Sequence, residues 1–269
     1  GDGDREERAL RLAIVGKPNT GKSTLLNRLT GEERSIVSAV PGTTRDVVEG
    51  SFEYRGKRFV ALDTAGIRRK SSVSSSVEFF SVNRAIRSVE EADVVLLLVD
   101  SVESVSDQDK KIASVVVRRG RGIILCLNKW DTLRMTPNVL NAMRDRVDFV
   151  FPVLHFAPIL PMSAKTGFGV PEVLDTAIRI AEQMTVRIGS APLNRALEEW
   201  TEQYPVPSGG KNLRIRFIAQ TRLRPTTFVC HVNRARGFPQ SYLRFLENRI
   251  RERFGIGMIP IRMEVEGTR

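Results

Sequence analysis

The 269-residue sequence predicts an α/β domain with a doubly wound, mostly parallel sheet, followed by a small α+β domain. Three observations predict this arrangement. Short apolar runs alternate with longer amphipathic stretches up to about residue 189, the order changes to α-β-β-α-β after residue 190, and the excess of basic residues is concentrated in that second part. We therefore expect an acidic linker over 1–10, a first domain over 11–189 and a second domain over 190–269.

The first domain is predicted from runs rich in Val, Ile and Leu that are too short for helices. Such runs suit strands buried on both faces of a parallel sheet, with helices between them. A segment before Arg55-Gly56 and the run after it predict an antiparallel hairpin at the sheet edge. The strands are expected at Leu12–Val15, Phe59–Leu62, Val94–Val99, Ile123–Leu127 and Phe156–Leu160, the hairpin at Val47–Tyr54 and Lys57–Leu62, and the helices at Val77–Glu91, Asp107–Arg119 and Pro171–Ile188.

The second domain is predicted from two helices and three strands. Its first strand alternates apolar residues from Leu213 to Ala219, including Phe217, with Arg214 and Arg216, which predicts an apolar inner face and a basic outer face. The other elements are expected at Leu193–Gln203 (helix), Thr226–Val232 (strand), Pro239–Phe254 (helix) and Met258–Val265 (strand).

The composition limits the class of protein. The net charge is +11, and residues 190–269 carry 14 Lys and Arg against 7 Asp and Glu. A basic region of this kind is typical of a surface for RNA, and the alternative is an ordinary solvated face. Two cysteines, Cys126 and Cys230, are too few for a disulfide framework, and no apolar run reaches the roughly 18 residues of a membrane span. We therefore expect a cytoplasmic location and no membrane span.

A phosphate-binding motif lies at the start of the first domain. Residues Gly16 to Ser23 match G-x-x-x-x-G-K-[ST] between a predicted strand and a predicted helix. Its glycines allow backbone N–H groups to face phosphate oxygens, the helix N-terminus adds positive potential, Lys22 can reach the β- and γ-phosphates, and the Ser23 hydroxyl can bind Mg²⁺. The alternative is an accidental glycine-rich turn. The predicted nucleotide-binding residues here are Asn19, Thr20, Gly21, Lys22, Ser23 and Thr24.

Two further motifs predict the rest of a guanine nucleotide site. Asp63-Thr64-Ala65-Gly66 offers a carboxylate for Mg²⁺ through water and a Gly66 N–H for the γ-phosphate. After the strand at 123–127 comes Asn128-Lys129-Trp130-Asp131, where the Asp131 carboxylate can accept the N1–H and N2–H₂ donors of guanine. A helix cap is the alternative for Asp131. Ser163-Ala164-Lys165 follows the next strand, and the Ala164 N–H suits guanine O6.

These motifs, in this order from Leu12 to Gly189, resemble the translation-factor-related GTPases. The segment Pro41-Gly42-Thr43-Thr44-Arg45-Asp46 is similar to switch I of a bacterial group that includes EngA (Der), Era and MnmE. The resemblance implies GTP and GDP as ligands, Mg²⁺ bound by Ser23 and Thr44, and catalytic roles for Lys22, Thr44 and Gly66.

The same resemblance implies stimulation by K⁺. Ile67 stands where Ras-like enzymes have a water-orienting Gln, and Ile has no polar group to position water. In this group a K⁺ near the phosphates offsets the charge that grows during hydrolysis. The implied ligands are Asn19 and the carbonyls of Ser38 and Val40. The alternative is that Asn19 only hydrogen-bonds the local backbone.

The resemblance narrows to the second GTPase domain and the KH-like domain of the EngA family. It is carried by 63–70, by 77–82 and, in the tail, by Leu193-Asn194-Arg195-Ala196-Leu197 and Leu246-Glu247-Asn248-Arg249. It implies a GTP-hydrolysing switch in ribosome biogenesis, acting in assembly of the large subunit. The implied partners are guanine nucleotide, a ribosomal subunit or rRNA, and an upstream GTPase domain of a longer protein.

The tail leaves RNA contact open, because it contains no G-x-x-G loop of the kind that KH domains use to clamp nucleotides. The candidate RNA contacts are Arg214, Arg216, Arg244 and Arg251, the last two on one predicted helix face. The alternatives are a domain-packing surface and a protein-docking or regulatory module without RNA. A tRNA-modifying enzyme like MnmE is disfavoured, because those relatives end in a cysteine-containing tail and the C-terminus of this sequence contains no cysteine.

Overall fold

A computed structural model of the chain describes residues 8–31, 50–62, 78–102, 106–133, 138–207 and 213–267. The chain forms two compact units, which divide between Ala181 and Glu182. None of the helices in these ranges is long and apolar enough to cross a membrane.

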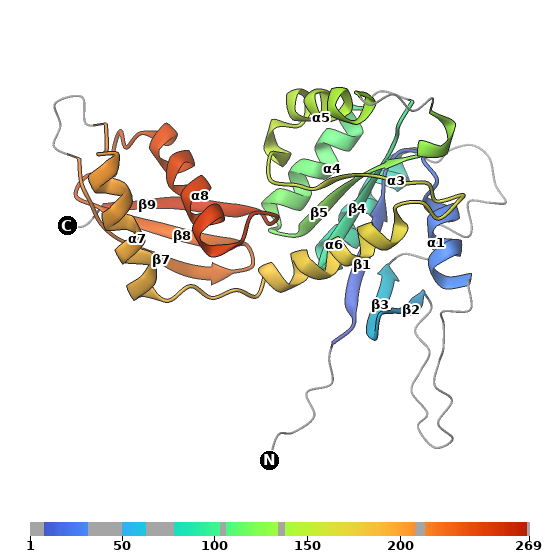
Figure 1. Cartoon of the computed structure of the whole chain (residues 1–269), viewed down its shortest axis with the longest axis horizontal. Coiled ribbons are helices and arrows are strands. Elements are labelled where there is room, and N and C mark those ends of the chain that lie inside the picture. Colours follow the sequence, from blue (N-terminus) through green and yellow to red (C-terminus); the bar gives the residue numbers. More distant parts are fainter. Residues whose placement is uncertain are drawn as a thin grey trace, which may run out of the picture. The chain divides into compact units, whose positions relative to one another are not determined.

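The first unit is built on a six-stranded sheet in the order β2-β3-β1-β4-β5-β6 (Figure 1). Strands β1, β3, β4, β5 and β6 pair in parallel, and only β2 is antiparallel, to β3. The predicted doubly wound sheet and its edge hairpin are confirmed. The strands are β1 Leu10–Val15, β2 Ser51–Tyr54, β3 Lys57–Leu62, β4 Val94–Asp100, β5 Gly122–Asn128 and β6 Ile159–Pro161.

Helices cover both faces of this sheet, so its central strands are buried throughout. All residues of β4 and β5 are buried, which explains why both read as unbroken apolar runs. One face of β1, β4 and β5 packs with residues of α3, α4 and α5, such as Val89, Ile112 and Val147. On the other face, a Cβ added at Gly122 would lie 2.4 Å from Ile180 of α6, so β5 and α6 meet too closely there for a side chain.

The helices of this unit are α1 Lys22–Gly31, α3 Glu78–Glu91, α4 Asp107–Arg118, α5 Val139–Val150 and α6 Val170–Gln183. Ser106 is the N-cap of helix α4: its hydroxyl accepts from the Asp109 N–H, and the Asp109 carboxylate accepts from the Ser106 N–H. This capping box satisfies two backbone donors at the helix start.

Two predicted boundaries in this unit are wrong, and the bounds of one helix were not predicted. Helix α5 lies between two predicted strands, where the alternation favours a helix, but no bounds were predicted for it. Strand β6 begins at Ile159 rather than Phe156, because Phe156 and Ala157 follow a 3₁₀ turn, Pro152–Leu154, and pack into the core. Helix α6 ends at Gln183 rather than Ile188.

The second unit has the predicted order α-β-β-α-β. It contains α7 Ser190–Gln203, β7 Ile215–Leu223, β8 Thr226–Val232, α8 Gln240–Phe254 and β9 Ile261–Gly267, and β8 is the central strand, antiparallel to β7 and parallel to β9. The division between the units falls eight residues before the predicted boundary at 189/190. Within the second unit, Gln220 of β7 donates to the Val186 carbonyl at 3.0 Å and accepts from the Ile188 N–H at 2.7 Å.

The predicted alternation along β7 fails because of a β-bulge. Ile215 pairs with Val232 but Phe217 pairs with His231, so Arg216 is an extra residue in β7. The extra residue reverses the faces of the residues from Phe217 to Gln220, where a second irregularity in the pairing follows. Phe217 is therefore 43% exposed and stacks on His231 with ring centroids 4.1 Å apart, while Ile218 is fully buried.

Candidate functional site

The phosphate-binding motif forms the loop between β1 and α1. Gly16 has φ +146°, and a Cβ there would lie 2.3 Å from the carbonyl oxygen of Leu98 in β4. Gly21 has φ +94°, and a Cβ there would lie 2.2 Å from the Asn128 side-chain nitrogen at the end of β5. Only glycine fits at either position. The motif glycines therefore let the loop lie directly on the ends of β4 and β5.

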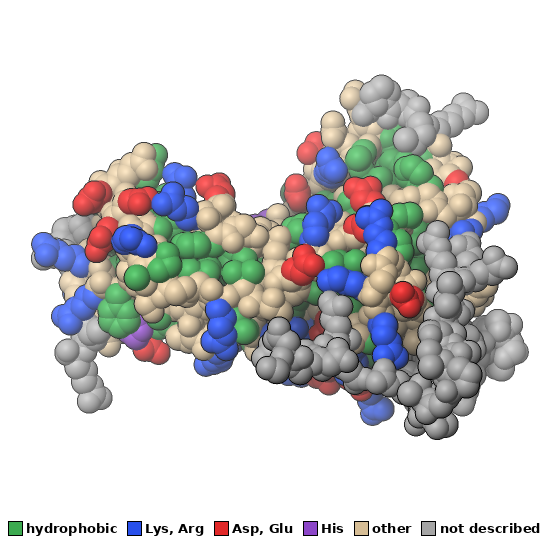
Figure 2. Space-filling model, turned by 60° about the horizontal axis from the view of Figure 1, so that its bottom comes forward, with side chains coloured by type: hydrophobic (Ala, Val, Ile, Leu, Met, Phe, Trp, Pro, Cys, Tyr) green, Lys and Arg blue, Asp and Glu red, His purple; other side chains and the backbone are tan. Residues whose placement is uncertain are grey.

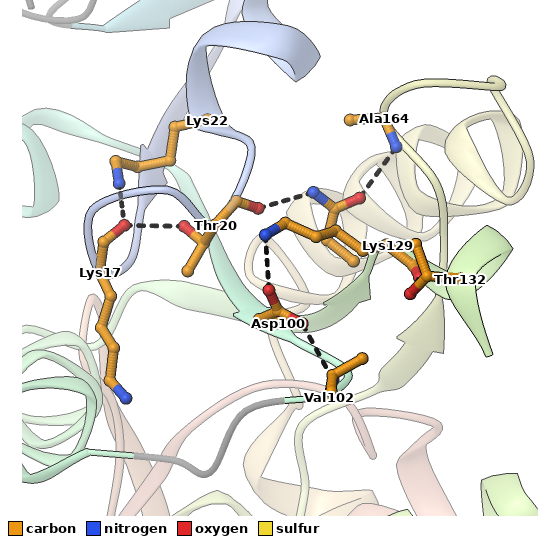
Figure 3. Close-up of polar contacts among 9 residues, drawn as sticks. Lys17, Thr20, Lys22, Asp100, Val102, Lys129, Thr132 and Ala164 are labelled. Carbon is orange, nitrogen blue, oxygen red and sulfur yellow. Dashed lines mark hydrogen bonds and ion pairs between the residues drawn. The ribbon is translucent and has the colours of Figure 1, made fainter.

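The polar side chains of the loop converge on one carbonyl. The Lys22 ammonium and the Thr20 hydroxyl both donate to the Lys17 carbonyl oxygen, the latter at 2.9 Å (Figure 3). Lys22 is thereby held over its own loop, where a phosphate oxygen could replace the carbonyl as acceptor. Ser23 and Thr24 lie exposed in the first turn of α1.

Asn128 joins the phosphate loop to the Ser163-Ala164-Lys165 loop. Its Nδ2 donates to the Thr20 carbonyl oxygen at 2.6 Å, and its Oδ1 accepts from the Ala164 N–H at 2.9 Å (Figure 3). Asn128 is only 2% exposed, so both bonds are made out of contact with solvent. The Ala164 N–H, which the sequence predicted for guanine O6, is therefore already a donor within the protein.

Lys129 and Asp131 follow β5 in a tight left-handed step. Lys129 has φ +63°, and its ammonium lies 2.6 Å from a carboxylate oxygen of Asp100 at the end of β4 (Figure 3). Asp131 lies inside the 3₁₀ turn Trp130–Thr132, whose cap is Lys129. The helix-cap alternative for Asp131 therefore does not hold. Its carboxylate is exposed and makes no hydrogen bond to the residues that the structure describes.

The ion sites are described only in part. Thr44, Asp63, Gly66, Ser38 and Val40 lie outside the described residues. Within the described ranges, no cluster of three or more His, Cys, Asp or Glu side chains could hold a metal on its own. The residues present fit the implied ions in chemistry, because Ser23 offers a hydroxyl oxygen beside the phosphate loop and hard cations such as Mg²⁺ bind oxygen.

The side chain of Asn19 is exposed, as a ligand for a bound cation needs to be. The residue has φ +64°. Its side chain makes no hydrogen bond to any residue in the described ranges, which argues against the alternative that it serves only the local backbone.

One candidate RNA contact, Arg251, is wrong. Its side chain is 8% exposed, and its guanidinium bonds Glu247 at 2.7 Å and the Ile259 carbonyl at 2.7 Å. Burial lowers the pKa of Arg251, and the bonds to Glu247 oppose that shift. Arg251 therefore holds the end of α8 to the segment before β9 and presents no donor to a partner.

The other three candidates remain at the surface. Arg214, Arg216 and Arg244 are exposed. On the face drawn in Figure 2, acidic side chains lie among the basic ones of the second unit, so its positive charge is interrupted there.

Two residues at the site belong to no sequence motif and were not predicted. Asp100 pairs with Lys129, and Arg28 of α1 donates to the carbonyls of Ala164 and Lys165 at 2.7 and 2.6 Å. Asp100 ends a buried strand, which is a weak signal for a site residue. For Arg28 no pattern in the sequence pointed to the loop it contacts, 136 residues away.

Two family models match parts of the chain. A family model described as "50S ribosome-binding GTPase" matches residues 11–129, and one described as "KH-domain-like of EngA bacterial GTPase enzymes, C-terminal" matches residues 187–266. The chain belongs to the EngA (Der) family of GTPases. Its two matched segments correspond to the two compact units.

Curated members of the EngA (Der) family match most of the chain. The protein "GTPase Der" of Desulfitobacterium hafniense strain DCB-2 is 42% identical over 95% of this chain and 58% of its own length. "GTPase Der" of Thermoanaerobacter sp. strain X514 is 43% identical over 95% of this chain and 58% of its own length. The chain thus spans less than two thirds of these Der proteins.

A solved structure of Era, "in complex with MgGDPNP and nucleotides 1506-1542 of 16S ribosomal RNA", is 24% identical, with a TM-score of 0.47 over 96% of this chain and 92% of that one.

Proposed function

We propose that this chain binds and hydrolyses GTP and acts as a molecular switch in ribosome biogenesis. The observation that carries the proposal is the Asn128 bridge between the phosphate loop and the Ala164 loop, with the Asp131 carboxylate exposed beside it. A carboxylate that only accepts matches the two adjacent donors of guanine and not the edge of adenine.

Each residue near the phosphates has a proposed task. The Lys22 ammonium and the backbone N–H groups of the loop stabilise charge on the β- and γ-phosphates, and α1 adds the positive end of its dipole. Bound Mg²⁺, held by Ser23 and Thr44 and through water by Asp63, would neutralise phosphate charge. Asn19, with the carbonyls of Ser38 and Val40, would hold K⁺. Thr44 and Gly66 would be ordered by the γ-phosphate and released after hydrolysis.

The ribosomal role is supported by the family descriptions. The model that matches 11–129 is described as ribosome-binding, and the second unit matches the C-terminal KH-like domain of the same family. We propose that this unit contacts rRNA or the ribosome through Arg214, Arg216 and Arg244, during assembly of the large subunit, in a protein that also carries an upstream GTPase domain.

The experiment that tests the switch is binding to purified ribosomal subunits. The chain is sedimented with 50S and with 30S subunits in the presence of a non-hydrolysable GTP analogue or of GDP. The expected result is preferential binding to 50S subunits with the analogue. Equal binding in both nucleotide states would overturn the switch, and binding to 30S alone would overturn the large-subunit role.

A second candidate function is a tail that docks proteins and does not touch RNA. The missing G-x-x-G loop and the structural use of Arg251 favour it. The triple variant Arg214→Ser, Arg216→Ser, Arg244→Ser distinguishes the two functions. RNA contact predicts weaker binding and a shallower dependence of log K on log salt, by about 0.7 to 0.9 for each phosphate that is no longer neutralised. An unchanged slope, with Arg118→Ser, Arg146→Ser and Arg187→Ser as the charge-matched control, would favour the docking module.

A further inference from the structure

Arg28 links the first helix to the loop that follows β6. It lies in the last turn of α1, where its Nε donates to the Ala164 carbonyl at 2.7 Å and its Nη2 donates to the Lys165 carbonyl at 2.6 Å. The planar guanidinium fork can hold two neighbouring carbonyls at once, which a Lys ammonium cannot do with fixed geometry. Two successive peptide groups of the loop are therefore fixed by one side chain.

Gly167 lies next to the guanidinium of Arg28. Gly167 has φ +88°, and a Cβ there would lie 3.0 Å from Nη1 of Arg28. A side chain at position 167 would press on the guanidinium. The turn at Gly167 therefore packs directly against the guanidinium of Arg28.

The N–H groups of the loop from Ser163 to Phe168 are almost all used within the protein. Ser163 donates to Phe168, Ala164 to Asn128, Thr166 to the Ser163 hydroxyl, Gly167 to the Ser163 carbonyl and Phe168 to the Thr166 hydroxyl. Within the described part of the chain, the Lys165 N–H is the one backbone N–H of this loop without a hydrogen bond.

The unused donor belongs to the peptide that Arg28 holds. The Ala164 carbonyl and the Lys165 N–H are two ends of one peptide plane, and the cis peptide bond of the described chain lies elsewhere, at Arg224-Pro225. In a trans peptide the carbonyl and the N–H point in opposite directions. By fixing the carbonyl, Arg28 also fixes the direction of the free N–H.

We propose that Arg28 is a positioning residue for guanine recognition, which holds the Ala164–Lys165 peptide so that the Lys165 N–H donates to O6 of the bound base. This inference rests on the guanine nucleotide site proposed above. It changes the assignment of the O6 donor from Ala164, whose N–H is used by Asn128, to the next residue. Asp131 would read the N1–H and N2–H₂ groups, and the Arg28-supported peptide would read O6.

The test compares three nucleotides that differ at one atom group each. GDP has O6 and the 2-amino group, 6-thio-GDP replaces O6 by sulfur, a weak acceptor, and IDP keeps O6 but lacks the 2-amino group. Dissociation constants are measured by competition against a fluorescent GDP for the unmodified chain and for Arg28→Ala, Arg28→Lys and Asn27→Ala. Asn27 is the control, because it is an exposed neighbour on the same helix.

The expected result is a selective loss at O6. Arg28→Ala should weaken GDP and IDP about tenfold, the size of one hydrogen bond to a well-placed donor, while 6-thio-GDP changes little. The ratio of the GDP and IDP dissociation constants should stay constant. The GDP affinity of Arg28→Lys should lie between those of the unmodified chain and Arg28→Ala, and that of Asn27→Ala should match the unmodified chain. An equal loss for all three nucleotides, or no loss for GDP, would overturn the inference. Failure of the unmodified chain to bind GDP would instead contradict the proposed function.

Discussion

The side-chain amide of Asn128 donates to the backbone carbonyl of Thr20 at 2.6 Å, across 108 positions of the chain. Through its other atom, Asn128 also accepts from the Ala164 N–H. One buried side chain at the end of a central strand therefore sets the distance between the loop that would hold phosphates and the loop that would hold the base. The position of each loop depends on the other.

Asn128→Ala should uncouple the two loops. The buried Thr20 carbonyl and Ala164 N–H both lose a partner, so the free energy of unfolding should fall by about 1–3 kcal/mol and GDP affinity should fall with it. Denaturant midpoints with and without GDP measure both effects. The control is Thr132→Ala, which removes an exposed hydroxyl bond at 2.7 Å to the Lys129 carbonyl. A midpoint equal to that of the control would show that the bridge adds nothing.

Asp131→Asn should change the base that is preferred. An amide presents a donor where the carboxylate presents only acceptors, so guanine loses a match and xanthine, with a carbonyl at position 2, gains one. The affinity for GDP should fall by about 100-fold, as two charge-assisted bonds are lost, and the affinity for XDP should rise. Isothermal titration measures both. Asp107→Asn, at a 91% exposed side chain, is the control. An unchanged ratio of GDP to XDP affinity would contradict the role of Asp131.

Asn19→Ala should remove the preference for potassium. The proposed cation binds at the exposed Asn19 side chain, so hydrolysis by the unmodified chain should be faster in KCl than in NaCl of equal concentration. The variant should show one rate in both salts, while Asn27→Ala keeps the difference. Phosphate release measures the rates. Equal rates for the unmodified chain in the two salts would exclude K⁺ stimulation.

Substitution of Arg251 should lower the free energy of unfolding much more than substitution of Arg244. Arg251→Met leaves the Glu247 carboxylate and the Ile259 carbonyl without their partner, so it should destabilise the protein by about 3–5 kcal/mol. Arg244→Met, at the exposed surface, should stay within about 0.5 kcal/mol. Chemical unfolding in a Trp130→Phe background, followed by the fluorescence of Trp200, a buried residue of α7, reports on the second unit. Similar losses for both variants would contradict the structural role assigned to Arg251.

The buried cysteines should make stability fall at high pH. Burial raises the pKa of Cys230 from 9.0 to about 12, and burial also raises the pKa of Cys126. Above pH 9 the unfolded chain releases these thiol protons while the folded chain keeps them. Stability is thus fully present below pH 9 and declines between pH 9 and 12, by up to about 1.4 kcal/mol per pH unit for each thiol.

Unfolding midpoints at pH 8 and pH 10 measure this slope. Cys230→Ala should show a smaller loss between the two values, whatever its stability at pH 8. An equal loss in the variant and the unmodified chain would show that other groups cause the decline.

Local sequence determined the elements and the motif positions. Strands β4 and β5 are buried on both faces, so each forms an unbroken apolar run. Such a run can be recognised in the sequence without knowing which strands pair with it. The positions of the glycines in the phosphate loop could also be predicted, because the motif spacing is typical of one backbone conformation. The order α-β-β-α-β of the second unit followed from periodicity alone.

Tertiary structure decided which side chains are available. Arg244 and Arg251 are seven positions apart and alike in sequence, but only the second meets Glu247 and the carbonyls before β9. Phe217 was expected inside and lies outside, because one extra residue, Arg216, reverses the face of the strand. Periodicity cannot show a bulge, since the bulge is defined by pairing with β8.

The site itself divides in the same way. The sequence by itself determined which residue types could bind a guanine nucleotide and roughly where each loop begins. Only the fold decided that the Ala164 N–H is used by Asn128, that Lys129 pairs with Asp100, and that Arg28 holds the Ala164–Lys165 peptide. These bonds join residues 29 to 136 positions apart, and such pairs meet only because parallel strands bring their carboxyl ends to one edge of the sheet.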